Sequence, residues 1–209
     1  MFGKKNKEID SGELLPLMES FYTIQGEGYY AGKPSYFLRI GGCDVGCHWC
    51  DVKESWDAEK HPPTEISTII NNAKQYSDTI VVTGGEPLMW NMSPLTAGLR
   101  NENLATHIET SGAYPLSGDW DWICLSPKKR MLPLDDIYKV ADELKVIVYN
   151  QNDFVFAEEQ AAKVQPNCKL FLQPEWSRRE QVIPMIVDYV LQHPKWKASL
   201  QTHKYMNIP

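Results

Sequence analysis

From residue 36 onward, short apolar runs alternate with longer stretches that have helical patterns. The apolar runs are rich in β-branched and aromatic residues and end at Gly, Pro, Asn or Ser, a pattern typical of strands. They predict strands at 36–40, 79–82, 105–108, 122–125, 144–148, 169–172 and 198–201. Helices are expected at 64–76, 135–142, 153–163 and 178–192. This alternation of strands and helices predicts a mainly parallel α/β fold.

Polar residues with capping ability stand at the expected helix starts. Thr64 follows a pair of prolines and Asn152 precedes the third helix, and both side-chain types accept hydrogen bonds from free backbone N–H groups. Ser177 and Glu180 have the spacing of a capping box, while Pro184 should kink this last helix or shift its start.

The length of the chain favours an open barrel. A complete eight-fold (β/α) barrel takes roughly 250 residues, and this chain has 209, of which 43% are hydrophobic. We therefore expect an incomplete, mainly parallel (β/α) barrel, built as a single domain over residues 14–209. Residues 1–13 are largely polar and are expected to form a disordered N-terminal end. In such folds the chemistry gathers at loops that follow the carboxyl ends of the strands.

The composition argues against several classes of partner. The net charge is -6, with lysine and arginine interspersed among acidic residues, so nucleic acid is not an expected partner. No apolar run approaches the ~20 residues that cross a bilayer, and the N-terminus lacks the apolar stretch of a signal peptide. A cytoplasmic protein without a membrane partner is therefore expected.

Cys43, Cys47 and Cys50 stand within eight positions, in a C-x3-C-x2-C arrangement that follows the first expected strand. Three thiolates can bind three irons of a cubic 4Fe-4S cluster and leave the fourth iron open to a small molecule. A structural zinc would need a fourth ligand, which no second C-x2-C or His pair supplies, although zinc and an inert group of thiols remain open. Cys124 and Cys168 lie in apolar stretches and are expected to be buried.

A second motif, Thr83-Gly-Gly-Glu-Pro87, follows the strand expected at 79–82. Consecutive glycines let a ligand approach the backbone closely, and Glu86 adds a carboxylate. Glu109 and Ser126 end the next two strands, so these groups should lie at one edge of the sheet. Taken alone, each segment is equally compatible with an ordinary turn or helix cap.

The cysteine spacing together with the Gly-Gly-Glu-Pro segment resembles the radical S-adenosylmethionine (SAM) superfamily. Two further segments are more specific: Phe21-Tyr-Thr-Ile-Gln-Gly-Glu-Gly28 near the start and Leu200-Gln-Thr-His-Lys-Tyr-Met-Asn-Ile-Pro209 at the end. With them, the chain resembles the 7-carboxy-7-deazaguanine synthase family over roughly residues 18–209. The resemblance implies that the incomplete barrel is a radical-SAM barrel.

That resemblance implies a radical SAM lyase of queuosine and related deazapurine biosynthesis. Its reaction contracts the ring of 6-carboxy-5,6,7,8-tetrahydropterin to 7-carboxy-7-deazaguanine and releases ammonia. The implied cofactors are a 4Fe-4S cluster, held by the three cysteines, and SAM. Their radical chemistry removes hydrogen from C6, so no side chain is expected to be the catalytic group. An electron donor such as flavodoxin or ferredoxin and a homodimeric assembly are also implied.

The family pattern places two sets of binding residues on this sequence. The residues implied to contact SAM are Thr83, Gly84, Gly85, Glu86, Glu109, Ser126, Lys128 and Gln173. Those implied to contact the pterin are Ile24, Gln25, Gly26, Glu27, Arg39, Thr83, His203 and, through its α-carboxylate, Pro209.

Several of these side chains suit a carboxylated pterin. Arg39 offers a fork of donors for the substrate carboxylate, and Glu27 can accept two N–H bonds from an aminopyrimidine. The alternatives are a surface arginine on a strand and, for His203, a satisfied loop histidine. Lys145 lies early in its strand, where a packed stem with a solvated ammonium group is at least as good an interpretation as a role in the site.

One position departs from the family pattern. The family usually has a Thr or Ser two residues after the last cysteine, whose hydroxyl helps to bind Mg2+, and here that residue is Val52. A hard cation needs oxygen ligands, so Mg2+ is left open as a cofactor, with Asp51 as a substitute ligand. Two alternatives to the family function also remain, a small glycyl-radical-enzyme activase and a non-catalytic zinc-binding module.

Overall fold

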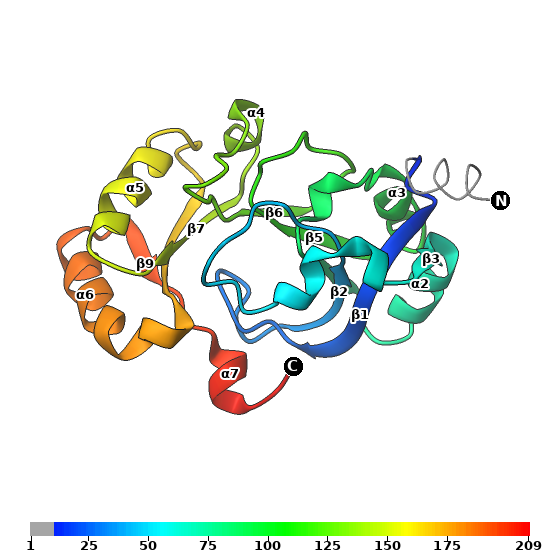
Figure 1. Cartoon of the computed structure of the whole chain (residues 1–209), viewed down its shortest axis with the longest axis horizontal. Helices are drawn as coiled ribbons and strands as arrows, with labels where there is room; N and C mark the ends of the chain where they lie inside the picture. Colours follow the sequence, from blue (N-terminus) through cyan, green and yellow to red (C-terminus); the bar gives the residue numbers. More distant parts are fainter. Residues whose placement is uncertain (1–10) are drawn as a thin grey trace.

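One mixed sheet forms the framework of the protein in the computed structural model, which describes residues 11–209. The order of the strands within the described part is β3-β1-β2-β4-β5-β6-β7-β8-β9 (Figure 1). The strands are β1 (Leu14–Ile24), β2 (Pro34–Ile40), β3 (Pro63–Glu65), β4 (Thr79–Gly84), β5 (Ala105–Thr110), β6 (Trp122–Leu125), β7 (Glu143–Val148), β8 (Lys169–Pro174) and β9 (Trp196–Ala198).

Parallel pairing joins β2 and all strands from β4 to β9, whereas β1 runs antiparallel to both β2 and β3. β3 and β9 lie at opposite edges, so the described strands do not close into a complete barrel. The expected incomplete, mainly parallel barrel is confirmed. Its parallel strands bring the loops after β2, β4, β5 and β6 to the same end of the sheet.

Helices cover the outer side of the curved sheet (Figure 1). They are α2 (Ile66–Ala73), α3 (Ser93–Asn101), α4 (Asp135–Tyr138), α5 (Asn152–Ala161) and α6 (Arg179–Gln192), whereas the short α7 (Thr202–Met206) lies apart from them near the C-terminus. In α2, Ile69, Ile70 and Ala73 are buried while Ser67 and Asn71 are exposed. This spacing of three to four residues gives the helix one apolar face, which packs on the sheet.

Alternation along the strands separates the core from a central cavity. In β7, Leu144, Val146 and Val148 belong to the apolar core, whereas Lys145 and Ile147, which alternate with them, line the cavity. β2 shows the same alternation, with Tyr36, Leu38 and Ile40 in the core and Phe37 and Arg39 at the cavity. Each fully buried Leu, Ile or Val side chain contributes about 1.5–3 kcal/mol, so the outer packing fixes which side chains face inward.

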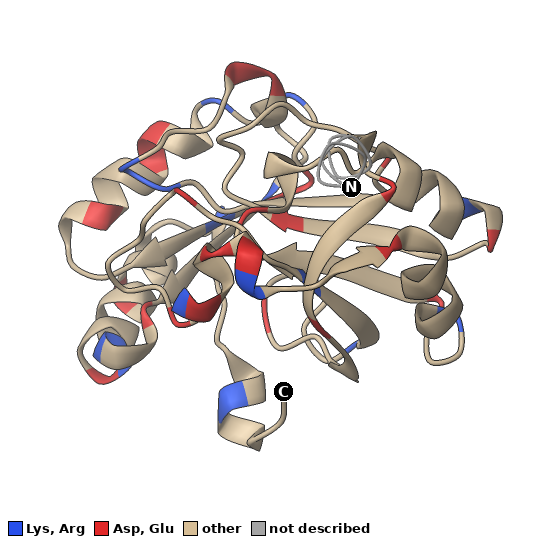
Figure 2. Ribbon diagram, turned by 45° about the vertical axis from the view of Figure 1, so that its right-hand side comes forward, with Lys and Arg blue, Asp and Glu red and all other residues tan. Residues whose placement is uncertain are grey.

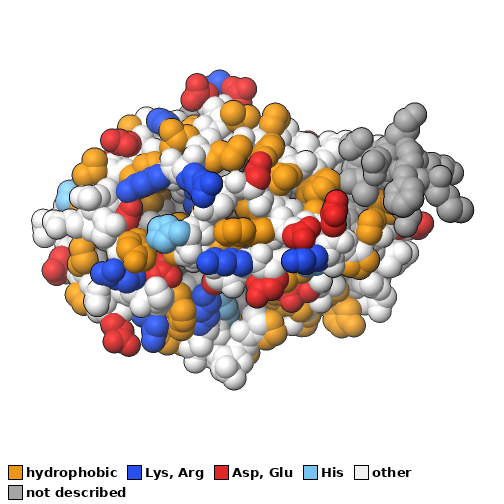
Figure 3. All heavy atoms as spheres, in the orientation of Figure 1, with side chains coloured by type: hydrophobic (Ala, Val, Ile, Leu, Met, Phe, Trp, Pro, Cys, Tyr) orange, Lys and Arg blue, Asp and Glu red, His pale blue; other side chains and the backbone are white. Residues whose placement is uncertain are grey.

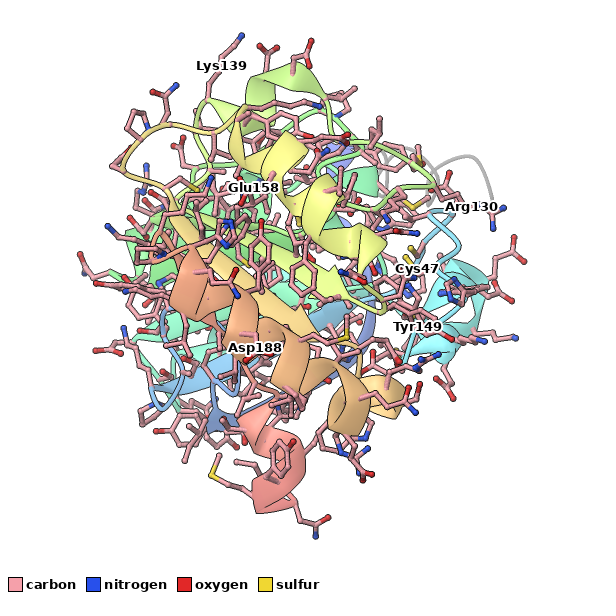
Figure 4. All side chains as sticks on the ribbon, turned by 90° about the vertical axis from the view of Figure 1, so that its left-hand side faces the viewer. Cys47, Arg130, Lys139, Tyr149, Glu158 and Asp188 are labelled. Atoms are coloured by element: carbon pink, nitrogen blue, oxygen red, sulfur yellow. The ribbon has the colours of Figure 1, made fainter. Side chains whose placement is uncertain are left out.

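A partly buried polar contact joins three of the outer elements. Glu158 on α5 accepts hydrogen bonds from the Tyr189 hydroxyl of α6 and from the Trp196 indole of β9, both at 2.8 Å (Figure 4). Lys195 donates to the same carboxylate. These bonds anchor the last strand, which leads directly into the C-terminal segment of the cavity wall.

Element boundaries differ from the expectations at several points. The strand expected at 198–201 is wrong, because β9 ends at Ala198. The helix expected at 64–76 begins only at Ile66, since Thr64 pairs with Leu15 across β3 and β1. The helix expected at 135–142 ends at Tyr138. β1, β3, α3 and α7 were not expected.

The expected helix caps also differ. Asn152 is the first residue of α5 and makes no cap, and Ser177 lies in a separate 3-10 turn in front of α6. Glu175 caps that turn instead, by accepting from the backbone N–H of Ser177. α6 begins at Arg179 and continues through Pro184, so the proline does not shift the start of the helix.

The first residues that the structure describes are bonded to the body of the protein. The Asn91 amide donates to the carbonyl of Ser11 at 2.9 Å, and the N–H of Ile66 donates to the carbonyl of Glu13 at 3.2 Å. The remainder of the N-terminal end expected to be disordered, residues 1–10, lies outside the described part.

Acidic and basic residues alternate along the ribbon in Figure 2, and both kinds are interspersed on the molecular face seen in Figure 3. This distribution matches the mixed charge pattern of the sequence. Among residues 11–209, no helix has the length and apolar character needed to cross a membrane.

Candidate active site

A cavity of about 270 Å³ opens at the inner side of the sheet. All residues assigned to the cluster, to SAM or to the substrate by the sequence line this cavity: Ile24, Gln25, Gly26, Glu27, Arg39, Cys43, Cys47, Cys50, Thr83, Gly84, Gly85, Glu86, Glu109, Ser126, Lys128, Gln173, His203 and Pro209. The structure therefore brings together segments from both ends of the chain and from five parallel strands.

The cysteine loop is anchored by backbone hydrogen bonds. The N–H of Cys43 donates to the carbonyl of Trp56 at 3.1 Å, and the N–H of Cys50 donates to the carbonyl of Cys47 at 3.1 Å. Arg130 donates to the carbonyl of Gly46 at 3.1 Å, and Figure 4 shows Cys47 near this arginine. The loop is thus held from two sides while its three thiols stay half-buried at the cavity.

Gly85 lets the Thr83–Pro87 turn approach the cysteine loop. A Cβ at this position would lie 2.3 Å from the carbonyl oxygen of Gly42 and 2.8 Å from Cβ of Cys43. Contacts below about 3 Å are not tolerated, so a side chain at residue 85 would push the two loops apart. The glycine thus keeps the space beside Cys43 free of a side chain.

The surroundings of the thiols fit a cluster. Burial raises the pKa of Cys43 and of Cys47, while the ammonium of Lys128 acts in the opposite direction on Cys47. Within residues 11–209, no three His, Cys, Asp or Glu side chains converge on a single-ion site. Thiolates that bind three different irons do not need to converge on one point. Three thiols at one cavity, next to the ammonium of Lys128 and to Gly85, which has no side chain, therefore suit a 4Fe-4S cluster.

The carboxylate of Glu86 is fully used within the protein. It accepts from the Thr110 hydroxyl at 2.5 Å, the Ser111 N–H at 2.7 Å, the Ser111 hydroxyl, and the Leu88 N–H at 3.1 Å. A carboxylate has about four acceptor positions, so these four donors saturate it. Glu86 is 1% exposed and ties the end of β4 to the end of β5. The backbone N–H groups of Gly85 and Glu86 are engaged as well, because they donate to the carbonyls of Ile40 at 2.9 Å and of Gly42 at 2.8 Å.

Ser126 and Lys128 form a compact pair after β6. The Lys128 ammonium donates to the carbonyl of Ser126 at 2.7 Å and to its hydroxyl at 2.6 Å. Burial lowers the pKa of Lys128, and the neighbouring Cys47 acts against this shift. The ammonium also lies 5.5 Å from the ring centre of Trp49. The pair places a cation between the cysteine loop and the end of β6.

Glu27 is a buried carboxylate in the loop after β1. Lys145 donates to it at 2.5 Å and Gln201 at 2.9 Å. Burial by itself raises the pKa of Glu27, but the charge of Lys145 and hydrogen bonds from Lys145, Gln173 and Gln201 lower it to about 2. Glu27 is therefore ionised at neutral pH and holds acceptor oxygens at the cavity wall.

Glu109 joins the two sides of the cavity. It accepts from the side-chain amide of Gln25 at 3.1 Å and from the Thr83 hydroxyl at 3.2 Å. Lys145 lies 3.6 Å away and forms a second ion pair with Glu109. The side chain implied to contact SAM thus also touches residues implied to contact the substrate.

Arg39, His203 and Pro209 complete the wall. Nε of Arg39 donates to Glu19 at 2.6 Å. The side chain of Arg39 is 19% exposed, so it is not a freely solvated surface arginine. Burial lowers the pKa of His203, which lies on α7. The hydroxyl of Thr23 donates to the backbone oxygen of Pro209 at 3.2 Å, which holds this residue against β1.

Sequence reasoning missed the partners of Lys145 and of Asp51. For Lys145, the sequence favours a solvated ammonium group at least as much as a role in the site. In the structure its side chain is only 5% exposed and its ammonium faces two carboxylates. A lysine that alternates with core residues in a buried strand is the signal for this placement. Asp51, the suggested substitute ligand for Mg2+, pairs with Lys204 at 2.6 Å, and no pattern in the sequence indicates that pair.

The chain is similar to known radical SAM proteins. Residues 38–125 match the model of the Radical SAM superfamily. Over 201 residues the chain is 66% identical to the 7-carboxy-7-deazaguanine synthase of Flavobacterium psychrophilum, with 96% of both chains covered. It is 47% identical over 194 residues to the protein of that name from Synechocystis sp., with 92% of this chain and 93% of the other covered.

A solved structure agrees with these relatives. The crystal structure of QueE from Escherichia coli has a TM-score of 0.81 and 26% identity, and the match covers 94% of this chain and 97% of that chain. Identity at the level of the first two relatives, over nearly the whole length, shows that the chain belongs to the 7-carboxy-7-deazaguanine synthase family of radical SAM enzymes.

Proposed function

We propose that this protein contracts the ring of 6-carboxy-5,6,7,8-tetrahydropterin to 7-carboxy-7-deazaguanine with loss of ammonia, in queuosine or related deazapurine biosynthesis. The observation that carries the proposal is that one cavity contains the three cysteines and the pterin-type residues Gln25, Glu27, Arg39 and His203. The similarity to the curated synthases supports it and argues against the activase and zinc-module alternatives.

Membership of the family implies a 4Fe-4S cluster and SAM as cofactors. When bound, they supply the hydrogen-abstracting radical chemistry that C6 requires, because its C–H bond is too weakly acidic for a side-chain base. Cys43, Cys47 and Cys50 hold the cluster in this proposal. The backbone of Thr83–Gly85, together with Glu109, Ser126, Lys128 and Gln173, binds SAM, and Glu86 acts indirectly by bracing this turn.

The substrate would lie between the loop after β1 and the C-terminal segment. Arg39 presents its guanidinium to the substrate carboxylate, and Glu27 accepts from the aminopyrimidine edge. The side-chain amide of Gln25 is bonded to Glu109. Its backbone N–H and carbonyl pair with Lys33 and Gly32, both at 2.8 Å, so Gln25 contributes to the pterin site mainly by shaping the loop after β1. His203 closes the pocket from α7. Ile24, Gly26, Thr83 and Pro209 form the remaining wall.

Mg2+ contributes little in this proposal. Val52 offers no ligand oxygen, and the carboxylate of Asp51 is engaged by Lys204. Residues 14–209 act as one domain, the assembly is a homodimer, and a flavodoxin or ferredoxin supplies the electron.

The test is anaerobic incubation of the reconstituted protein with SAM, reductant and 6-carboxytetrahydropterin. We expect a product lighter than the substrate by one ammonia and free ammonia in equal amount. A Cys50→Ala variant serves as the control and should give neither. Unchanged substrate with the wild-type protein, after SAM cleavage has been verified, would overturn the proposed substrate.

A further inference from the structure

Lys145 is a buried cation at the floor of the cavity. It lies in the middle of β7, between the core residues Leu144 and Val146, and its side chain is 5% exposed. Burying an ammonium group is costly unless it is paired and hydrogen-bonded. Two carboxylates supply that pairing, at 2.5 Å for Glu27 and 3.6 Å for Glu109.

These two carboxylates come from different elements of the fold. Glu27 belongs to the loop after β1, where the substrate is proposed to lie, and Glu109 belongs to β5 on the SAM side. Each has a further donor of its own, Gln201 for Glu27 and Thr83 for Glu109. Lys145 is the cation that both share, and it is therefore placed to fix their charge and their separation.

Other ionisable groups face this set from neighbouring elements. Cys124 comes from β6, Glu143 from the start of β7, Lys128 from the loop after β6, and His203 from α7. Burial raises the pKa of the Cys124 thiol well above its usual range, and burial also raises the pKa of Glu143. Lys128 is bonded to Ser126.

Removing the ammonium of Lys145 would leave Glu27 and Glu109 close together in a site of low dielectric. Like charges in such a site cannot both ionise freely, so one carboxyl takes up a proton. Glu27 is the more buried of the two, because its side chain is 14% exposed against 24% for Glu109. Burial penalises the charged form, so Glu27 is the one expected to become neutral.

We propose that Lys145 is a positioning residue, whose ammonium holds Glu27 as an oriented carboxylate toward the substrate and makes substrate affinity independent of pH around neutrality. The inference rests on the proposed function, in which Glu27 contacts the pterin. Lys145 acts through Glu27, and direct contact with the reacting atoms is not part of its role.

The experiment measures binding without turnover. 6-Carboxytetrahydropterin is titrated anaerobically into the reconstituted holoenzyme with SAM and no reductant, at pH 6.5, 7.5 and 8.5. For each variant the dissociation constant is divided by that of the wild type at the same pH, which removes the titration of the ligand. SAM affinity and melting temperature are recorded alongside.

For Lys145→Met, we expect a dissociation constant about ten or more times that of the wild type at pH 6.5, and this ratio should fall as the pH rises. At low pH the Glu27 carboxyl of the variant is protonated and binds the pterin poorly, because a carboxyl whose pKa lies one unit above the pH is only about one-tenth ionised. Lys145→Arg keeps the cation and should show a ratio without this slope. Lys197→Met, an exposed lysine on β9, is the matched control and should behave as the wild type.

The double variant Lys145→Met/Glu27→Gln tests whether Glu27 causes the pH dependence of this ratio, because glutamine does not titrate. We expect the pH dependence to vanish in this variant. A pH dependence that persists in the double variant, or a ratio of dissociation constants for Lys145→Met that is equal at all three pH values, would overturn the proposal.

If Lys145→Met does not fold, the double variant should fold because the pair of charged carboxylates is gone. Failure of both variants to fold would show that Lys145 is purely structural. Absence of pterin binding by the wild type would contradict the proposed function instead.

Discussion

The imidazole ring of His203 lies against the backbone of Gly26, so that a Cβ added at residue 26 would be 2.1 Å from Nδ1 of the histidine. The contact is reinforced by Thr202, whose N–H and hydroxyl both donate to the carbonyl of Gly26 at 2.9 Å. The loop after β1 and α7 are therefore docked on each other. This docking closes the cavity between segments that lie near the two ends of the chain.

Gly26→Ala should disturb this docking. The methyl group displaces the histidine ring and α7, and overpacking of this kind costs about 1–3 kcal/mol. We expect a lower melting temperature and a Michaelis constant for the pterin raised about ten-fold, since ~1.4 kcal/mol corresponds to a factor of ten. The double variant Gly26→Ala/His203→Ala should regain part of the melting temperature but not the affinity. An unchanged Michaelis constant in Gly26→Ala would contradict a role for this contact.

Loss of any cysteine of the loop should abolish the cluster. Cys47→Ala removes one of three iron ligands, so we expect loss of iron, acid-labile sulfide and SAM cleavage after anaerobic reconstitution. Cys168→Ala is the control, because this thiol is buried in the core away from the loop and should leave all three measurements unchanged. Iron content and SAM cleavage at wild-type levels in Cys47→Ala would show that the cluster is held elsewhere.

Omission of Mg2+ should lower turnover only modestly. Val52 has no ligand oxygen, and the Asp51 carboxylate is paired with Lys204 at 2.6 Å. Introducing a hydroxyl with Val52→Thr should make turnover more dependent on Mg2+, measured as the ratio of rates with and without the ion. If the unmodified enzyme is inactive in metal-free buffer, other groups must bind the ion and this expectation is wrong.

Arg39→Lys should weaken binding of the carboxylated substrate in particular. The planar guanidinium can bind a carboxylate through two parallel hydrogen bonds, a geometry that the ammonium of a lysine cannot reproduce. Hydrogen bonds to charged groups contribute about 1.5–3 kcal/mol, so we expect the Michaelis constant to rise about ten-fold or more. A tetrahydropterin without the carboxylate should bind equally well to both forms. Equal weakening for both ligands would place the carboxylate away from Arg39.

The parallel strands could be predicted from the sequence, and the antiparallel edge could not. Strands such as β4 and β6 are continuous apolar runs bounded by turn residues, which is the pattern of a strand buried on both faces. β1 contains Pro16 and Glu19, has a register shift between Leu17 and Glu19, and is only partly buried. Pro94 and Gly98 in α3 similarly favour a turn over a helix in a local pattern.

The site was predicted where short motifs carry the chemistry. The cysteine and glycine motifs are local, so their positions in the sequence give their positions at the strand ends. The partners of Lys145 are Glu27 and Glu109, which lie 118 and 36 residues earlier in the chain. Pairs of this kind depend on how the strands assemble, and a single sequence does not encode them in any local pattern. The saturation of Glu86 by Thr110 and Ser111 was missed for the same reason.

Turnover of a substrate that carries deuterium at C6 tests most directly whether this cavity holds SAM and the pterin together. The labelled 6-carboxytetrahydropterin is incubated anaerobically with reconstituted holoenzyme, SAM and a chemical reductant, and the products are examined by mass spectrometry. We expect 7-carboxy-7-deazaguanine to form and deuterium to appear in the nucleoside part of SAM. Product that forms while all the deuterium is lost to water would contradict hydrogen transfer between two ligands bound side by side in this cavity.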